Sequence, residues 1–179
     1  MFKGKLIIAL IGPLGAGKDT VAQYLVKYKG FQRFAFADTI KQAYYGASGH
    51  TEEEFKAARG TPLEEEIRKG LWAYSDSIKK EKGDSFFAMC LFQQICDSPY
   101  KQIVVTDIRT SSELNIMCAM CANIVLVLKG SEKILGSRLF YDDLSFSINS
   151  TNIFINRESS DINEREQAIE KWYTKARFT

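Results

Sequence analysis

Short runs of apolar residues alternate along the chain with longer segments in which apolar positions recur at helical spacing. The runs lie at residues 5–11, 31–36, 103–106, 124–128 and 152–155. Mostly apolar runs of this length are typical of parallel strands that are buried on both faces. The alternation predicts an α/β fold, in which a parallel sheet of about five strands carries helices on both faces.

The segments between these runs predict the helices. After the first run, Val21, Tyr24, Leu25 and Tyr28 form a stripe on one helix face, and Gly30 marks the end of that helix. Residues 38–98 predict a helical insertion before the third strand, with helices that begin near Thr39, Thr51, Pro62 and Asp84. A last helix is expected to carry Ile162, Ile169, Trp172 and Tyr173 on one face.

A glycine-rich loop joins the first strand to the first helix. Its sequence, residues 12–20, is Gly-Pro-Leu-Gly-Ala-Gly-Lys-Asp-Thr. The glycines allow several backbone N–H groups to point inward, and the following helix N-terminus adds positive potential, so the loop predicts a nest for phosphates. We expect ATP as the cofactor, held by Gly12, Gly15, Ala16, Gly17, Lys18, Asp19 and Thr20.

The loop departs from the usual Gly-x-x-x-x-Gly-Lys-[Ser/Thr] pattern at one position. Lys18 stands where a lysine reaches the terminal phosphates, but Asp19 takes the place of the hydroxyl residue. Thr20 is then the nearest hydroxyl that could meet Mg²⁺ or its water shell. The sequence leaves open whether Asp19 or Thr20 contacts the ion.

Composition limits the classes of protein. The chain has 179 residues, 45% hydrophobic and 26% charged, which fits a single domain over residues 1–179. A formal net charge of +2 predicts no nucleic-acid or membrane partner, and no apolar run approaches the roughly 20 residues that span a bilayer. We expect a cytoplasmic protein whose cysteines stay reduced, with Cys118 and Cys121 in a helix core beside Leu114 and Met117.

Polar residues follow the predicted strands at the edge of the sheet where ligands bind in α/β folds. Asp38 follows the second strand, and Asp107 and Arg109 follow the third. Arg109 could clamp a phosphate, or pair structurally with Asp107. Asp107 could hold Mg²⁺ together with Thr20, or cap the helix that begins near Ser111. Lys18, Asp38 and Arg109 are the candidates for catalysis.

Further basic residues indicate where an acceptor could bind. The candidates on the acceptor side are the basic residues Arg33, Lys41, Arg59, Arg68 and Arg109, together with the acid Asp38. The alternative is that they are solvated surface charges. Residues 130–160 predict a lid over ATP, with Arg138 as a cofactor ligand and Arg157 nearby.

Absent motifs narrow the reaction. Asp107 is followed by Ile108 and not by a second acid, which argues against a hydrolytic motor. The chain has no Asn-Lys-x-Asp and no Asp-x-x-Gly, which argues against a GTPase. Of the reactions considered, phosphoryl transfer to a small-molecule acceptor is the one that remains.

Three separated motifs together resemble the deoxynucleoside monophosphate kinases of phages and their bacterial relatives. They are Gly12–Thr20, Phe34–Lys41, and Val104–Arg109 with Glu113 after it. The resemblance implies a three-layer P-loop NTPase fold and ATP-dependent phosphorylation of a nucleoside monophosphate. It also implies that Lys18 meets the donor phosphates and that Lys41 and Arg109 lie near the acceptor or transferred phosphate.

The chain departs from this family in two places. Leu63 stands after Thr61 and Pro62, where relatives often carry arginine, and no arginine-rich lid is evident. A dephospho-coenzyme A kinase or another small-metabolite kinase is therefore an alternative, and so is a nucleotide-binding regulatory protein with little catalysis. Either a monomer or a homodimer fits the sequence.

Overall fold

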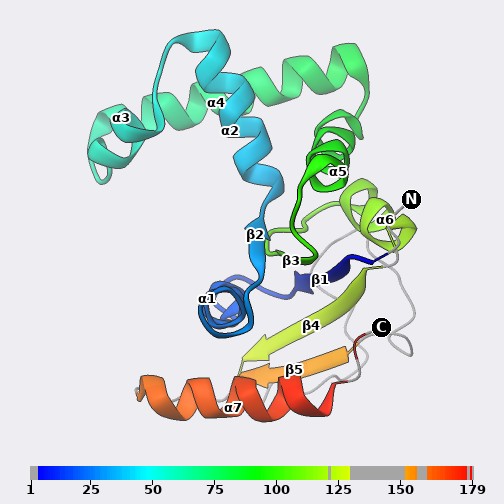
Figure 1. The fold of residues 1–179 in the computed structure, drawn as a ribbon. Helices are drawn as coiled ribbons and strands as arrows, with labels where there is room; N and C mark the ends of the chain where they lie inside the picture. Colours follow the sequence, from blue (N-terminus) through cyan, green and yellow to red (C-terminus); the bar gives the residue numbers. More distant parts are fainter. Residues whose placement is uncertain (1–3, 121, 130–151, 157–160, 177, 179) are drawn as a thin grey trace.

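The computed structural model of the chain describes residues 4–120, 122–129, 152–156, 161–176 and 178. In these residues five strands form one sheet in the order β2-β3-β1-β4-β5, and every neighbouring pair is parallel (Figure 1). The strands are β1 (Leu6–Ile11), β2 (Gln32–Phe34), β3 (Gln102–Val105), β4 (Asn123–Lys129) and β5 (Asn152–Asn156). The predicted α/β fold with a parallel sheet is confirmed.

The helices connect these strands. They are α1 (Lys18–Lys29), α2 (Phe36–Ser48), α3 (Glu52–Ala57), α4 (Pro62–Lys82), α5 (Phe86–Asp97), α6 (Ser111–Ala119) and α7 (Ile162–Lys175). Four of them, α2 to α5, lie between β2 and β3, at the place where the sequence predicts an insertion.

Strand β1 lies in the middle of the sheet and is buried on both faces. Ile7, Ala9 and Ile11 pack with residues of α5 and α6, whereas Ile8 and Leu10 pack with residues of α1 and α7. The alternation of side chains along a strand sends these two sets to opposite faces. The sheet therefore has helices on both sides, and its two apolar cores fix the end of β1, where the glycine-rich loop begins.

The insertion has a small apolar cluster of its own. Three of its residues are buried together: Tyr44 of α2, Ala58 at the end of α3, and Ile67 of α4. Figure 1 shows α3 and most of α4 standing away from the sheet. Gly70 of α4 lets the two helices approach, because a Cβ atom at this position would overlap the hydroxyl of Tyr44. The insertion is thus held by contacts among its own helices.

Some sequence predictions need correction. The second strand ends at Phe34, and α2 begins at Phe36 rather than near Thr39. Helix α6 buries Leu114 and Met117, but Cys118 is exposed, so its predicted place in the core is wrong. Residues 130–151 and 157–160 of the predicted lid, with Arg138 and Arg157, lie outside the described residues, as does Cys121. None of the helices described here is long and apolar enough to cross a membrane.

Candidate functional site: a cavity at the glycine-rich loop and a basic cavity

The glycine-rich loop turns sharply between β1 and α1. Gly12, Gly15 and Gly17 all have positive φ values, of 146°, 79° and 94°. At Gly12 there is also no room for a side chain, since a Cβ atom would overlap the carbonyl oxygen of Val127 in β4. Glycine is therefore required where the loop passes β4, which holds the loop at the carboxyl edge of the sheet.

Lys18 folds back over this loop. Its Nζ donates hydrogen bonds to the carbonyl oxygens of Gly12, at 2.7 Å, and Pro13, at 2.9 Å. Burial lowers the pKa of Lys18, and the negative charge of Asp19 raises it in part. The positive charge of Arg109 lowers the pKa again. A cation that is partly desolvated and faces a second cation gains from a bound anion, which would supply the missing negative charge.

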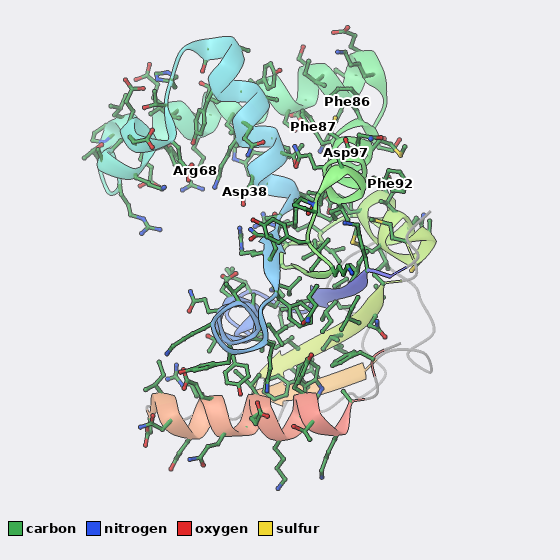
Figure 2. The ribbon with its side chains drawn as sticks, in the orientation of Figure 1. Asp38, Arg68, Phe86, Phe87, Phe92 and Asp97 are labelled. Atoms are coloured by element: carbon green, nitrogen blue, oxygen red, sulfur yellow. The ribbon has the colours of Figure 1, made fainter. Side chains whose placement is uncertain are left out.

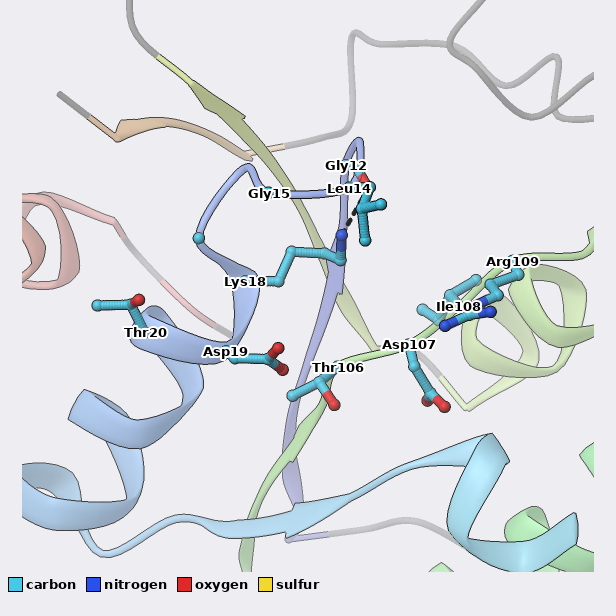
Figure 3. A pocket seen from close by; sticks show the side chains of 11 residues that line it. Gly12, Leu14, Gly15, Lys18, Asp19, Thr20, Thr106, Asp107, Ile108 and Arg109 are labelled. Carbon is cyan, nitrogen blue, oxygen red and sulfur yellow. Dashed lines mark hydrogen bonds between the residues drawn. The ribbon is translucent and has the colours of Figure 1, made fainter. Parts of the chain in front are cut away.

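The loop and the end of β3 line one cavity of about 500 Å³ (Figure 3). Most of the predicted cofactor residues are in its wall, together with both residues predicted after the third strand: Gly12, Leu14, Gly15, Gly17, Lys18, Asp19, Thr20, Thr106, Asp107, Ile108 and Arg109. Ala16 is buried, and its N–H donates to the carbonyl oxygen of Pro13. We call this space the phosphate cavity.

Asp107 is bound to the start of a helix from another part of the chain. Its two carboxylate oxygens accept hydrogen bonds from the backbone N–H groups of Phe36, at 2.8 Å, and Ala37, at 2.7 Å. Burial raises the pKa of Asp107, and these two hydrogen bonds counteract that rise. The alternative that Asp107 caps α6 is wrong, because it caps α2 instead.

The cap of α6 comes from Thr110 and Glu113. The Thr110 hydroxyl accepts from the N–H of Glu113, and the Glu113 carboxylate accepts from the N–H groups of Thr110 and Arg109. Burial raises the pKa of the Glu113 carboxyl, while these backbone bonds lower it. Thr110 and Glu113 have capping-box spacing, which could have revealed this role. The cap fixes the backbone of Arg109 and leaves its side chain exposed beside the phosphate cavity.

A second cavity, of about 330 Å³, lies in the insertion between α2, α3 and α4. Its lining has four basic and two acidic side chains around one aromatic ring: Lys41, Lys56, Arg59, Arg68, Glu52, Glu64 and Phe55. The ring of Phe55 has Lys41 Nζ 5.9 Å and Arg68 Cζ 5.6 Å from its centroid. We call this space the basic cavity. Lys41, Arg59 and Arg68 were predicted from the sequence, but Phe55 and Lys56 were not.

Asp38 and Arg33 lie between these two regions. Asp38 is in the first turn of α2, 2.7 Å from Arg33 Nη1 and 3.7 Å from Lys41 Nζ, and it lines neither cavity. Figure 2 shows Asp38 and Arg68 on the side of the insertion that is turned toward α1. The structure thus joins Asp38 to one residue of the basic cavity, Lys41.

The phosphate cavity has oxygen atoms that suit a hard cation such as Mg²⁺. The hydroxyl of Thr106 is buried and has no hydrogen-bond partner among the described residues. In Figure 3 the Asp19 side chain extends toward Thr106, whereas the Thr20 side chain extends away from it. The described residues hold no group of three or more His, Cys, Asp or Glu side chains suited to a metal. The residues present therefore fit an ion that takes most of its ligands from phosphate and water.

Comparisons with known proteins bear on the fold. No protein-family profile matches the sequence, and neither does any curated protein. Among solved structures, the Thermus thermophilus protein TT1252 superposes with a TM-score of 0.50 at 15% identity, over 98% of this chain and 100% of that one. At this identity the likeness concerns the fold alone.

Two other solved structures superpose more loosely. A sugar kinase from Janibacter sp. HTCC2649 has a TM-score of 0.45 at 14% identity, over 96% of both chains. A gluconokinase from Sinorhizobium meliloti 1021 has a TM-score of 0.41 at 15% identity, over 97% of this chain and 99% of that one. No functional conclusion for this chain follows from these two likenesses.

Proposed function

We propose that this protein is an ATP-dependent phosphotransferase that moves the γ-phosphate to a nucleoside or deoxynucleoside monophosphate. The observation that carries the proposal is the phosphate cavity, where the glycine-rich loop with Lys18 faces Arg109 at the end of β3. Phosphoryl transfer depends mainly on positioning and on cations that stabilise charge on the moving group. A loop lysine on one side and an arginine on the other provide such cations.

The basic cavity is the proposed acceptor site. Its excess of basic side chains favours an anionic acceptor, and the exposed guanidinium of Arg68 offers a fork of N–H donors that matches phosphate. Phe55 adds an aromatic surface in the same cavity. A nucleoside monophosphate combines a phosphate with a flat ring, so it suits this combination of side chains better than a neutral sugar does.

Magnesium would be held at the phosphate cavity by Asp19 and Thr106, in place of Thr20 and Asp107, which the sequence predicts for this role. When bound, the ion would neutralise charge on the phosphate oxygens of ATP. Lys18 and Arg109 bind and orient the phosphates from opposite walls. The capping box of α6 keeps the Arg109 backbone fixed while its side chain reaches into the cavity.

A coupled ADP-release assay tests the proposal. The purified protein is given ATP, Mg²⁺ and, in turn, each common nucleoside and deoxynucleoside monophosphate, with dephospho-coenzyme A for comparison. We expect turnover with at least one monophosphate and none in the Lys18→Ala variant. Turnover with dephospho-coenzyme A alone would move the acceptor to the alternative class, and no turnover with any of them would refute the kinase proposal.

A matched pair of variants tests the acceptor site. Arg68 lines the basic cavity, whereas its neighbour Lys69 does not, and each pairs with a glutamate four residues earlier. Charge-assisted hydrogen bonds contribute roughly 1.5–3 kcal/mol, so Arg68→Ala should raise the KM for the acceptor about ten- to hundredfold. Lys69→Ala should leave it unchanged. Equal effects of the two variants would remove the basic cavity from the acceptor site.

A further inference from the structure

Helix α2 begins without a cap of its own. Ala35 is the residue before its first turn, and its side chain has no atom that accepts a hydrogen bond. The first N–H groups of a helix have no partner inside the helix, and an orphaned buried N–H is costly. Here the N–H groups of Phe36 and Ala37 both donate to Asp107, which lies about 70 residues further along the chain.

Asp107 is also part of the phosphate cavity. It lies two residues after the end of β3, between Thr106 and Ile108, which are both buried, so its backbone is held against the core. One carboxylate therefore joins a wall of the phosphate cavity to the first turn of α2. That helix carries Asp38 and, one turn further on, Lys41 of the basic cavity.

This arrangement competes with a role as a metal ligand. Each oxygen of Asp107 already accepts one short hydrogen bond, and the two donors belong to the positive end of a helix. Asp19, in contrast, is exposed, and it lies at the start of the helix that carries the loop lysine. Of the two aspartates that line the phosphate cavity, Asp19 is the one whose carboxylate is open to an ion.

We propose that Asp107 is a positioning residue that fixes the start of α2 against the phosphate cavity, and that it is not a direct ligand of Mg²⁺. The part of this inference that concerns the acceptor depends on the proposed function, because α2 contributes to the basic cavity. The part that concerns α2 and the metal does not.

Two measurements on the Asp107→Asn variant test the proposal: amide hydrogen exchange and the binding of ADP. At least one of the amides of Phe36 and Ala37 should exchange about five- to tenfold faster than in the unmodified protein, because asparagine keeps only one of the two acceptor oxygens, and this is the size of effect that loss of a helix cap produces. The ratio of ADP affinities with and without Mg²⁺ should stay within twofold. Asp76→Asn, an exposed acid on α4, is the matched control and should change neither quantity.

A second substitution supplies the cap locally. Ala35 has the extended backbone that capping residues adopt, with φ −149° and ψ 140°, and serine is among the best helix caps. Ala35→Ser added to Asp107→Asn should return the exchange of the Ala37 amide, the second of the helix, to within about twofold of the unmodified rate, because a serine cap accepts from that position. If an acceptor has been found, its KM should recover as well, because the cap and not the charge of residue 107 is restored.

The proposal is overturned if Asp107→Asn weakens Mg²⁺-dependent ADP binding tenfold or more and Ala35→Ser does not restore it, since Asp107 would then hold the ion. Unchanged exchange of Phe36 and Ala37 would also overturn it. If Asp107→Asn alone does not fold, the double variant carries the test, and its failure to fold counts against the proposal. These readouts use ADP and Mg²⁺ alone, so they stand even if every candidate acceptor fails.

Discussion

At Gly12, both the backbone conformation and the neighbouring strand restrict which residue can occupy the position. Its φ of 146° is rare for residues with a side chain, and a Cβ atom would overlap the Val127 carbonyl oxygen of the neighbouring strand. Gly12→Ala must therefore move the loop or β4. We expect the free energy of unfolding to fall by about 1–3 kcal/mol, the usual cost of such strain, together with weaker ADP binding. Urea denaturation and calorimetric titration with ADP measure the two effects.

Gly46 provides the control. It lies within α2, and a Cβ atom there would meet nothing within 4 Å. Gly46→Ala should stabilise the protein by about 0.5–1 kcal/mol, because alanine is the better helix former. If Gly12→Ala were equally harmless, the loop would not be confined by β4 as described.

At the scale of single residues, the sequence predicted what depends on local pattern. The loop glycines and Lys18 follow from a contiguous motif, and the structure places them in one cavity with Arg109. The partner of Asp107 could not be predicted, because Phe36 lies about 70 residues away and offers only its backbone N–H. The roles of these residues in phosphoryl transfer stay predictions.

At the scale of secondary-structure elements, α1 and α7 are joined by a polar contact at their interface. The hydroxyl of Tyr24 in α1 donates to the carboxylate of Glu170 in α7, and Lys29 donates to the same carboxylate at 2.9 Å. Burial, and then this hydrogen bond, raise the pKa of Tyr24 from 10.0 to about 12. The neutral phenol is thus favoured in the folded chain, and its stabilising effect is complete below pH 10 and lost as the pH rises toward 12.

Tyr24→Phe tests this contact. At pH 8 the variant should have a lower urea midpoint than the unmodified protein, because Glu170 loses a donor, and the difference should shrink between pH 10 and 12. A phenol that titrates late should also disappear from the phenolate absorbance curve. Tyr28→Phe, which removes an exposed hydroxyl bonded to Glu166, should leave the urea midpoint at pH 8 unchanged. A difference between Tyr24→Phe and the unmodified protein that stays constant up to pH 12 would contradict the assignment.

The ends of the elements show where local sequence is sufficient. Helix α3 begins directly after Thr51, as predicted, because Thr51 and Glu54 cap it from within the segment. The β2–α2 boundary was misjudged, since Phe34 to Phe36 continue an apolar run and the cap that starts the helix comes from Asp107. Element type follows from periodicity, whereas an end depends on whichever group satisfies its N–H donors.

At the scale of the whole molecule, the order of the strands was not predictable from the runs themselves. Each run indicates a strand buried on both faces, but β1 lies between β3 and β4 only because α1 carries the chain past β3 to β2, and α6 carries it back past β1 to β4. This order brings the ends of β1 and β3 together, while the basic cavity lies among α2, α3 and α4, which follow β2 in the chain. The phosphate cavity belongs to the sheet, and the basic cavity belongs to the insertion.

Gly70→Ala tests whether these two regions can be altered separately. Helix propensity alone would favour alanine, but its Cβ atom would overlap the Tyr44 hydroxyl. The Tyr44 ring must then move, and it packs 5.8 Å from the ring of Tyr74. We expect at least a severalfold rise in the KM for the acceptor. The affinity for ADP with Mg²⁺ should stay within twofold, because no residue of the phosphate cavity touches Gly70.

The double variant Tyr44→Phe with Gly70→Ala separates this overlap from any other effect of the alanine. Removing the hydroxyl removes the worst overlap and leaves Tyr44 Cζ 3.1 Å from the new Cβ, so the double variant should recover most of the KM and urea-midpoint change seen in Gly70→Ala. Interacting neighbours are non-additive in this way, whereas distant sites add. A parallel loss of ADP affinity in Gly70→Ala would show that the insertion and the phosphate cavity form one cooperative unit and cannot be altered separately.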